Sequence, residues 1–429
     1  MALFGLFYLS TILGIEAGVA GLLLFVVRIY DAITDPLMGT ISDRTHHRWG
    51  ARRPYLLLGS LTLGVAFALF FNLPSLEGAA MIAVVLATLI LYSTSYTIFA
   101  VPYLAMSPDI APDYDSRTRL MSMRVFFLIV GVLLGSTGGP MLVQAAGDGR
   151  RGYAVLGLAI GALVIVGGLV AFFGTRGVKE RNTATQLTER RALLVEAKAL
   201  YSQVQSVFRF APFRLLTVVK LLQLAVLALA LACTPYFFRF VLERSTGDIT
   251  YYFATFSFCG LASLVAWRWI IGRWGKRDVY IYSIALYAIG MASWFLWHPE
   301  EAEIFFYLRA AFIGVIANGT LVCALSLLPD TMEYDRLASG ADRQGVMSGV
   351  FTTVEKIAGA LGPLIIGVML QTMGLDSTAA PAEQPASALF AVKLGISVIP
   401  ALFCLAAIPF LIAYKLGPKE LQQARQDAQ

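Results

Sequence analysis

Residues 48–53 read Arg-Trp-Gly-Ala-Arg-Arg, and residues 273–277, 225 positions further on, read Arg-Trp-Gly-Lys-Arg. A second pair of segments, 108–114 and 329–334, lies at nearly the same separation, and each begins with Pro-Asp and ends with an acidic residue and a tyrosine. One short repeat could arise by chance, but two repeats in register indicate an internal duplication. The chain is therefore expected to fold as two similar halves.

The repeated segments lie beside long apolar stretches. The chain has 429 residues, of which 58% are hydrophobic and 14% are charged, and its mean hydropathy is +0.72. Apolar segments of about 20 residues are long enough to cross roughly 30 Å of hydrocarbon as helices. The sequence therefore predicts an all-α polytopic membrane protein. Eleven full-length spans are expected, at residues 17–41, 54–72, 81–107, 121–143, 153–174, 214–241, 249–271, 279–297, 304–328, 345–371 and 387–414.

A long polar segment, residues 175–213, divides these spans into two groups. We expect an N-terminal helical half at residues 1–174, a C-terminal half at 214–415 and a cytoplasmic tail at 416–429. Parallel repeats of about six helices, with a basic loop after the second and eighth helix, are the plan of the major facilitator fold. Residues 1–14 are apolar but span only about half a bilayer, so the first of the twelve helices is expected to be truncated in this sequence.

Lysine and arginine gather in alternate loops between the spans, which is the mark of the cytoplasmic side of a membrane protein. We therefore expect a multi-pass protein of the plasma (inner) membrane with a cytoplasmic C-terminus. The net charge of +6 then reflects topology and contact with the lipid bilayer, and no nucleic acid partner is expected. The four cysteines lie in apolar spans without metal-ligand spacing, so no cofactor is expected. A monomer is expected.

Two acidic residues lie inside the first full-length span. Asp31 and Asp35 are four residues apart, so they share one helix face. Each carboxylate at such a depth costs on the order of 2.5 to 3.5 kcal/mol on insertion scales. Two close carboxylates are not both stable when ionised and bare, so the pair is expected to hold a proton or Na⁺. Pro36 has no amide hydrogen and leaves the carbonyl oxygen of Ala32 free to assist.

A basic residue also lies deep in an apolar span. Lys356 needs a partner for its charge, which is either the aspartate pair, so that the two halves are coupled, or a polar group of a solute. The alternative is a static ion pair of the aspartates with Arg28 or Lys356 that only holds helices together. Lys220 and Arg309 lie nearer the ends of their spans, and their side chains are expected to extend to the headgroup region.

Charged residues in the repeated loops predict a conformational latch, because carboxylate and guanidinium groups there can bridge neighbouring helix ends in one state of the transport cycle. The candidate latch residues are Gly39, Asp43, Arg44, Arg52, Arg53, Arg273, Lys276 and Arg277.

Four segments, residues 28–54, 96–102, 108–124 and 329–356, resemble the glycoside-pentoside-hexuronide:cation symporters of the major facilitator superfamily, a family that includes the melibiose permease. The resemblance covers nearly the whole chain. It implies a secondary transporter and not an enzyme, one that carries a sugar, glycoside or hexuronide together with Na⁺ or H⁺ by alternating access.

The resemblance also implies roles for single residues. Asp31 and Asp35 would bind the coupling cation with help from Thr97, and Lys356 would lie close to that site. Arg124 would belong to the sugar site. Two further candidates for solute binding or coupling within the matching segments are Arg28 and Tyr96.

The sequence departs from the family at the positions that bind galactosides. A helix-four acid of the melibiose permease falls on Ala100, an aromatic residue falls on Leu104, and the helix-one acid falls before Met1. Galactoside recognition of that type is therefore not expected. Lysophospholipid symporters belong to the same superfamily, so an amphipathic solute is the alternative. A magnesium-dependent intramembrane prenyltransferase is a remote alternative, since such enzymes are expected to carry two acidic clusters and this chain has one.

Overall fold

The computed structural model describes residues 3–45, 47–106, 110, 120, 123–124, 127, 130–177, 204–298, 300–340 and 343–427, and the regular structure within them is entirely helical. The first half of the chain forms α1 (Gly5–Phe7), η1 (Tyr8–Ile12), α2 (Ala17–Arg44), α3 (Arg53–Phe70), α4 (Gly78–Ala105), η2 (Leu134–Gly138), α7 (Gly139–Ala145) and α8 (Gly149–Gly174). The second half forms α10 (Ala211–Tyr236), η4 (Phe237–Val241), α11 (Asp248–Ala262), α12 (Leu264–Trp274), α13 (Lys276–Ala292), η5 (Ser293–Leu296), α14 (Glu303–Ser339), α15 (Gln344–Thr372), η6 (Pro381–Glu383), α16 (Ala386–Ile396), α17 (Val398–Ala413) and α18 (Pro418–Asp427).

The helices are long enough for a multi-pass membrane protein. Within the described residues, nine helices are long and apolar enough to cross a bilayer, and the bent pair α11 and α12 would make ten. The predicted span at 121–143 lies partly outside the described residues, and its part from residue 130 on belongs to the apolar helical stretch Val130–Ala145. A helix satisfies its own backbone hydrogen bonds, which explains why apolar segments of this length are helical. The prediction of an all-α polytopic fold is confirmed.

Two predicted spans differ from the structure. The span expected at 249–271 is not straight, because α11 and α12 meet at an angle of 47°. The bend occurs at Ser263, whose hydroxyl donates a hydrogen bond to the carbonyl oxygen of Gly260 at 2.7 Å, and Gly/Ser pairs are common sites of helix kinks. The span expected at 304–328 continues as one helix to Ser339, because hydropathy marks only the apolar part of a helix.

The expected connecting segment and tail both contain helical residues. Residues 204–209, within the expected loop 175–213, are helical, and α10 begins before that loop was expected to end. The expected tail, 416–429, contains the polar helix α18. Residues 178–203 lie outside the described part of the chain.

The repeated basic segments make equivalent contacts at the ends of helices. Arg53 donates a hydrogen bond to the carbonyl oxygen of Phe172 at 3.0 Å, near the end of α8. Arg277 donates to the carbonyl oxygen of Ile412 at 2.7 Å, near the end of α17. These arginines satisfy carbonyl groups that the last turn of a helix leaves unpaired.

The residues that precede these arginines are also equivalent. Arg52 donates a hydrogen bond to the carbonyl oxygen of Ala105 at 2.7 Å, at the end of α4. Lys276 forms an ion pair of 2.5 Å with Asp330 on α14. In both halves the basic segment thus joins the helix that follows it to two other helices of the same half, as expected of a duplicated fold.

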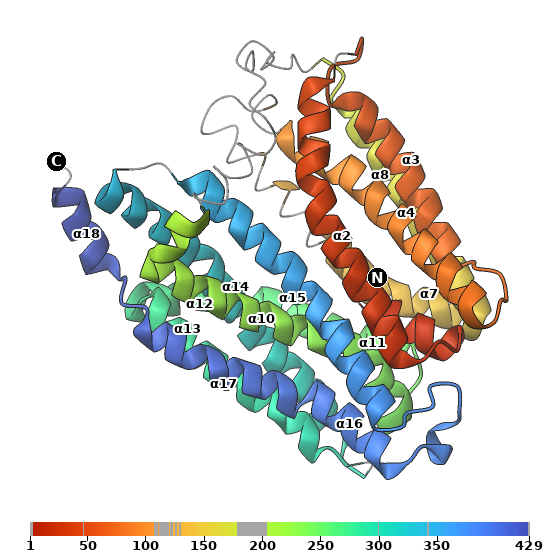
Figure 1. Ribbon diagram of the computed structural model, residues 1–429. Coiled ribbons are helices and arrows are strands. Elements are labelled where there is room, and N and C mark those ends of the chain that lie inside the picture. The colour runs from red at the N-terminus through yellow and green to blue at the C-terminus, as the bar shows by residue number, and fades with distance from the viewer. Residues whose placement is uncertain are drawn as a thin grey trace.

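Helices α2 and α15 face each other from the two halves and approach closely at one end. A Cβ atom at Gly21 would lie 2.5 Å from the carbonyl oxygen of Pro363, and one at Gly367 would lie 2.3 Å from that of Ala17. Figure 1 shows the same two helices diverging toward their other ends. We call the region of close approach the closed end and the opposite end, which carries residues 48–53 and the beginning of α15, the open end.

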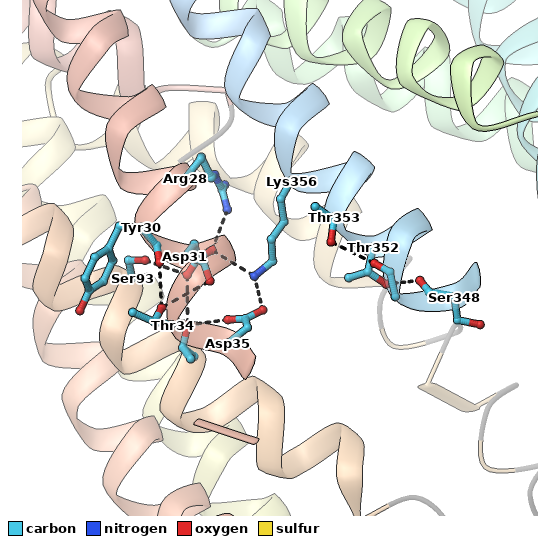
Figure 2. Close-up of polar contacts among 12 residues, drawn as sticks. Arg28, Tyr30, Asp31, Thr34, Asp35, Ser93, Ser348, Thr352, Thr353 and Lys356 are labelled. Carbon is cyan, nitrogen blue, oxygen red and sulfur yellow. Dashed lines mark hydrogen bonds and ion pairs between the residues drawn. The ribbon is translucent and has the colours of Figure 1, made fainter. Parts of the chain in front are cut away.

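The surface of α15 near the open end is polar. Ser348, Thr352 and Thr353 are exposed there, and Figure 2 shows them on the part of α15 that has diverged from α2. The hydroxyl groups of Thr352 and Thr353 donate hydrogen bonds to the carbonyl oxygens of Ser348 and Gly349, at 3.0 Å each. This part of α15 is therefore polar, although the helix as a whole is apolar enough to cross a bilayer.

We expect Gly367→Ala to destabilise the protein by about 1–3 kcal/mol, because the added methyl group would meet a backbone carbonyl that has no room to move. The matched control is Gly359→Ala on the same helix, where a Cβ meets no atom within 4 Å. Thermal unfolding of the purified protein in detergent measures the difference. An equal effect of the two substitutions would show that close packing of α2 against α15 does not stabilise the closed end.

Candidate functional site

The acidic pair lies near the middle of α2, where this helix faces α15 of the other half. Asp31 is buried, with 2% of its surface exposed, whereas the side chain of Asp35 is 28% exposed. Helix α4 places Ser93 and Thr97 beside the two carboxylates, and α15 places Lys356 there. Side chains from three helices therefore surround the two carboxylates, whose charges are costly inside the apolar span of α2.

One oxygen of each carboxylate faces hydroxyl groups. Thr97 Oγ1 lies 3.1 Å from Asp31 Oδ1 and 2.8 Å from Asp35 Oδ1, and Ser93 donates a hydrogen bond to Asp31 Oδ1 at 2.7 Å. A threonine hydroxyl has a single hydrogen, so it donates to one carboxylate at a time. Four oxygen atoms from four side chains thus converge on one place.

The second oxygen of each carboxylate faces a cation. Lys356 Nζ pairs closely with Asp35 Oδ2 and lies 3.7 Å from Asp31 Oδ2, as Figure 2 shows. Arg28, one turn before Asp31 on α2, approaches the same Asp31 oxygen at 3.7 Å. Two carboxylates are therefore balanced by two basic side chains, of which Lys356 belongs to the other half of the molecule.

The alternative to a cation site was an ion pair of the aspartates with Arg28 or Lys356, and both contacts are present in the structure. An ionic link between α2 and α15 would require only the carboxylates and Lys356. The hydroxyl groups of Ser93 and Thr97 add neutral oxygen ligands on the opposite side of the carboxylates. Carboxylate and hydroxyl oxygens are the donors that hard cations prefer, so the arrangement also fits a cation site.

Ser93 was not identified from the sequence. It lies about one helical turn before Thr97 on α4, so a four-residue spacing of hydroxyl side chains in an apolar span was the available signal. Hydroxyl residues are common in membrane helices, where they often bond to their own backbone, as Thr88 does to the carbonyl oxygen of Val84. The spacing therefore becomes informative only when the position of α2 is known.

A cavity of about 640 Å³ lies beside the acidic pair, between the two halves. Arg28, Asp31, Tyr92, Ser93 and Tyr96 line it from α2 and α4, and mostly leucine side chains line it from α10. The volume lies within the roughly 300–1,000 Å³ that is typical of pockets for small organic ligands. Two of the predicted solute-binding candidates, on α2 and α4, are therefore at this cavity.

The structure does not bring Arg124 to the same place. Arg124 is helical and exposed, and it is not among the residues that line the cavity. Its neighbours at 125–126 and 128–129 lie outside the described residues.

Lys220 does not extend to the headgroup region as predicted. The Lys220 side chain is 12% exposed, and its Nζ lies 2.5 Å from Oε1 of Glu355. Glu355 precedes Lys356 on α15 and lines the cavity. Arg309 forms a two-point ion pair with Glu301, at 2.5 and 2.7 Å. Hydropathy does not reveal a partner on another helix, which explains why the prediction for Lys220 was wrong. Glu301 lies in the bend just before α14, at the end of the span that carries Arg309, so the prediction for Arg309 stays a prediction.

Four of the predicted latch residues join helices of the same half at the open end. The helix-end contacts described above are made by Arg52, Arg53, Lys276 and Arg277. Arg273 lies 5.9 Å from the centroid of the Trp269 ring, and Gly39 lies on the same helix as the acidic pair. The side chains of Asp43 and Arg44 lie outside the described residues. A latch between the halves stays a prediction.

Comparisons with known proteins identify the family and the fold of the chain. The model of the family described as "MFS/sugar transport protein" matches residues 1–418. The "Putative glycoside/cation symporter YagG" of Escherichia coli (strain K12) is 28% identical over 423 residues, which cover 97% of this chain and 87% of that protein. The "Isoprimeverose transporter" of Lactiplantibacillus pentosus is 24% identical, with 98% and 86% covered.

Solved structures show the same fold. A D-xylose-proton symporter superposes with a TM-score of 0.63 at 14% identity, and the match covers 98% of this chain and 93% of that one. The nucleoside transporter NupG gives a TM-score of 0.58 at 11% identity, with 96% and 93% covered. The predicted family is confirmed: the chain belongs to the MFS/sugar transport protein family of the major facilitator superfamily, as an integral inner-membrane secondary transporter and not an enzyme.

Proposed function

We propose that the protein is a cation:solute symporter in which Asp31 and Asp35 bind the coupling Na⁺ or H⁺. The observation that carries this proposal is that hydroxyl groups from α4 and an ammonium group from α15 converge on the same two carboxylates. Relatives that are named as glycoside/cation symporter and isoprimeverose transporter support it. No cofactor besides the coupling cation is needed.

Lys356 and a bound cation are alternative counter-charges for the aspartates. When a cation binds between the carboxylates and the hydroxyls, the attraction between α2 and Lys356 weakens. Because Lys356 belongs to the other half, cation binding is then linked to the relative position of the halves, and by reciprocity to solute binding between them. A cation that enters down the membrane potential contributes about 2.3 kcal/mol per 100 mV, enough for more than tenfold accumulation of solute.

The geometry accommodates either cation. A single proton on one carboxylate would leave the Thr97 hydroxyl free to donate to the other. Na⁺ would instead use several oxygens at once, those of Asp31, Asp35, Ser93 and Thr97. The two cations therefore depend to different degrees on the hydroxyl groups.

The cavity favours a solute with a polar part and an apolar part. Tyr92, Ser93 and Tyr96 offer hydroxyl groups on one wall, and the opposite wall on α10 is apolar. A glycoside or hexuronide with an apolar aglycone has this character. The alternative is a lysophospholipid, which is favoured by the row of leucines on α10 along which an acyl chain could lie, formed by Leu224, Leu227 and Leu231.

The basic segments at the open end would face the cytoplasm under the positive-inside rule. The structure then represents a state that is open to the cytoplasm, and the C-terminus lies on the same side. Both halves of the site come from one chain, so we propose that a monomer is the working unit.

Asp35→Asn should abolish gradient-driven accumulation, because an amide keeps the size of the side chain and removes the charge that binds the cation. We expect at least a tenfold lower accumulation ratio in membrane vesicles with imposed Na⁺ or H⁺ gradients, while downhill exchange persists. Tyr30→Phe is the matched control, since it removes only a hydrogen bond of 2.9 Å to Thr94 on α4. Full accumulation by Asp35→Asn would mean that the carboxylates only hold helices together.

Thr97→Ala should raise the Na⁺ concentration needed for half-maximal uptake about tenfold, because a hydrogen bond to a charged group contributes roughly 1.5–3 kcal/mol. Thr97→Ser should restore the parental value, since it keeps the hydroxyl. Asp31→Asn is likewise expected to weaken Na⁺ coupling more than H⁺ coupling. Uptake at graded Na⁺ and at graded pH measures both dependences. Equal losses with Na⁺ and H⁺ would assign Thr97 to helix packing.

The solute class is tested with purified protein in proteoliposomes under a Na⁺ or H⁺ gradient. We expect uptake of labelled glycosides or glucuronides. Uptake of lysophospholipids alone would establish the alternative solute, and uptake of only cationic solutes would contradict both assignments, because basic side chains at the cavity require acceptor groups.

A further inference from the structure

A second, smaller cavity lies between the two halves at the closed end. Its volume is about 240 Å³, and it shares no lining residue with the larger cavity. Phe7 and Tyr153 line it from the first half, and Arg239, Arg244 and Thr246 line it from the second. The volume is below the roughly 300 Å³ at which pockets for drug-sized ligands begin, so the cavity suits a small group.

Arg239 brings a positive charge to this cavity, whose lining also includes the exposed Asp148. It lies in η4, in the last part of a membrane span, and its guanidinium group contacts the rings of Phe7 and Phe240, with 5.9 and 5.2 Å to the centroids. Neither an ion pair nor a hydrogen bond is found for Arg239 among the described residues. Arg244, by contrast, is paired with Glu303 at 3.2 Å.

Tyr153 lines the same cavity from the other half. The residue is 2% exposed, and its hydroxyl has no hydrogen-bond partner in the described structure. A buried polar group without a partner costs roughly 1–3 kcal/mol. A half-buried guanidinium and a buried phenol both need an acceptor, and neither is hydrogen-bonded to one within the described residues.

We propose that this cavity binds a small anion, with a carboxylate or sulfonate group between the Arg239 guanidinium and the Tyr153 hydroxyl. An oxyanion has the acceptor atoms that both donors require. Asp148 also lines the cavity, but it is exposed, so solvent screens its charge more than that of the half-buried arginine. Its repulsion grows with each charge on the ligand and favours a monoanion.

The two donors come from different halves, so a bound anion connects the halves at the closed end. It therefore stabilises the state seen here over a state that is open at that end. The anion can be the acidic group of a sugar acid or a free small anion, since both present the same atoms. This inference does not depend on the proposed symport.

The test is titration calorimetry on the purified full chain in detergent with methanesulfonate, glucuronate and glucose. We expect both anions to bind and glucose not to bind. Arg239→Gln should weaken anion binding at least tenfold, and Tyr153→Phe, which keeps the ring, about three- to tenfold. The matched control is Arg151→Gln, an exposed arginine two residues before Tyr153, which should bind as the parent does.

Tighter binding of glucuronate than of methanesulfonate would identify a sugar acid as the ligand, and equal binding would identify small monoanions in general. Absence of binding to the parent, or equal binding to Arg239→Gln, would overturn the proposal.

Discussion

Two carboxylates in an apolar span are the constraint on which the rest of the structure depends. Neither α2 nor any single neighbour can offset both charges. Hydroxyl groups on α4 and the ammonium group of Lys356 on α15 must come within hydrogen-bonding distance together. Asp31 and Asp35, whose charges are costly inside an apolar span, therefore require contact between the two halves at this place. The stability of this contact depends on which positive charge balances the carboxylates.

The position of the acidic pair between the closed and the open end gives this requirement a geometric consequence. Glycines allow α2 and α15 to touch at the closed end, and the helices separate beyond the pair. Lys356 thus reaches from α15 to α2 at the position along the two helices where they begin to separate. At this height a small change in the angle between the halves changes the ion-pair distance, whereas nearer the closed end backbone contacts would resist it.

Much of this arrangement could be predicted from residues that are costly in a membrane. The repeated basic segments predicted the duplicated helical plan, and the spacing of Asp31 and Asp35, with Lys356 in a distant span, predicted a charged site between the halves. Features that depend on the relative position of helices could not be predicted. The partner of Lys220, the contribution of Ser93 and the bend at Ser263 follow from neighbours on other helices or from local hydrogen bonds, and these leave no periodic pattern.

The adjacent residues Glu355 and Lys356 have one more consequence. Successive side chains on a helix point about 100° apart, and here the acidic one reaches α10 of its own half while the basic one reaches α2 of the other. A roll of α15 about its long axis would therefore strain both ion pairs simultaneously. Rotation of α15 would therefore transmit a change at the carboxylates of α2 to Lys220, in addition to any change in the angle between the halves. During this rotation, Glu355 would move within the wall of the larger cavity.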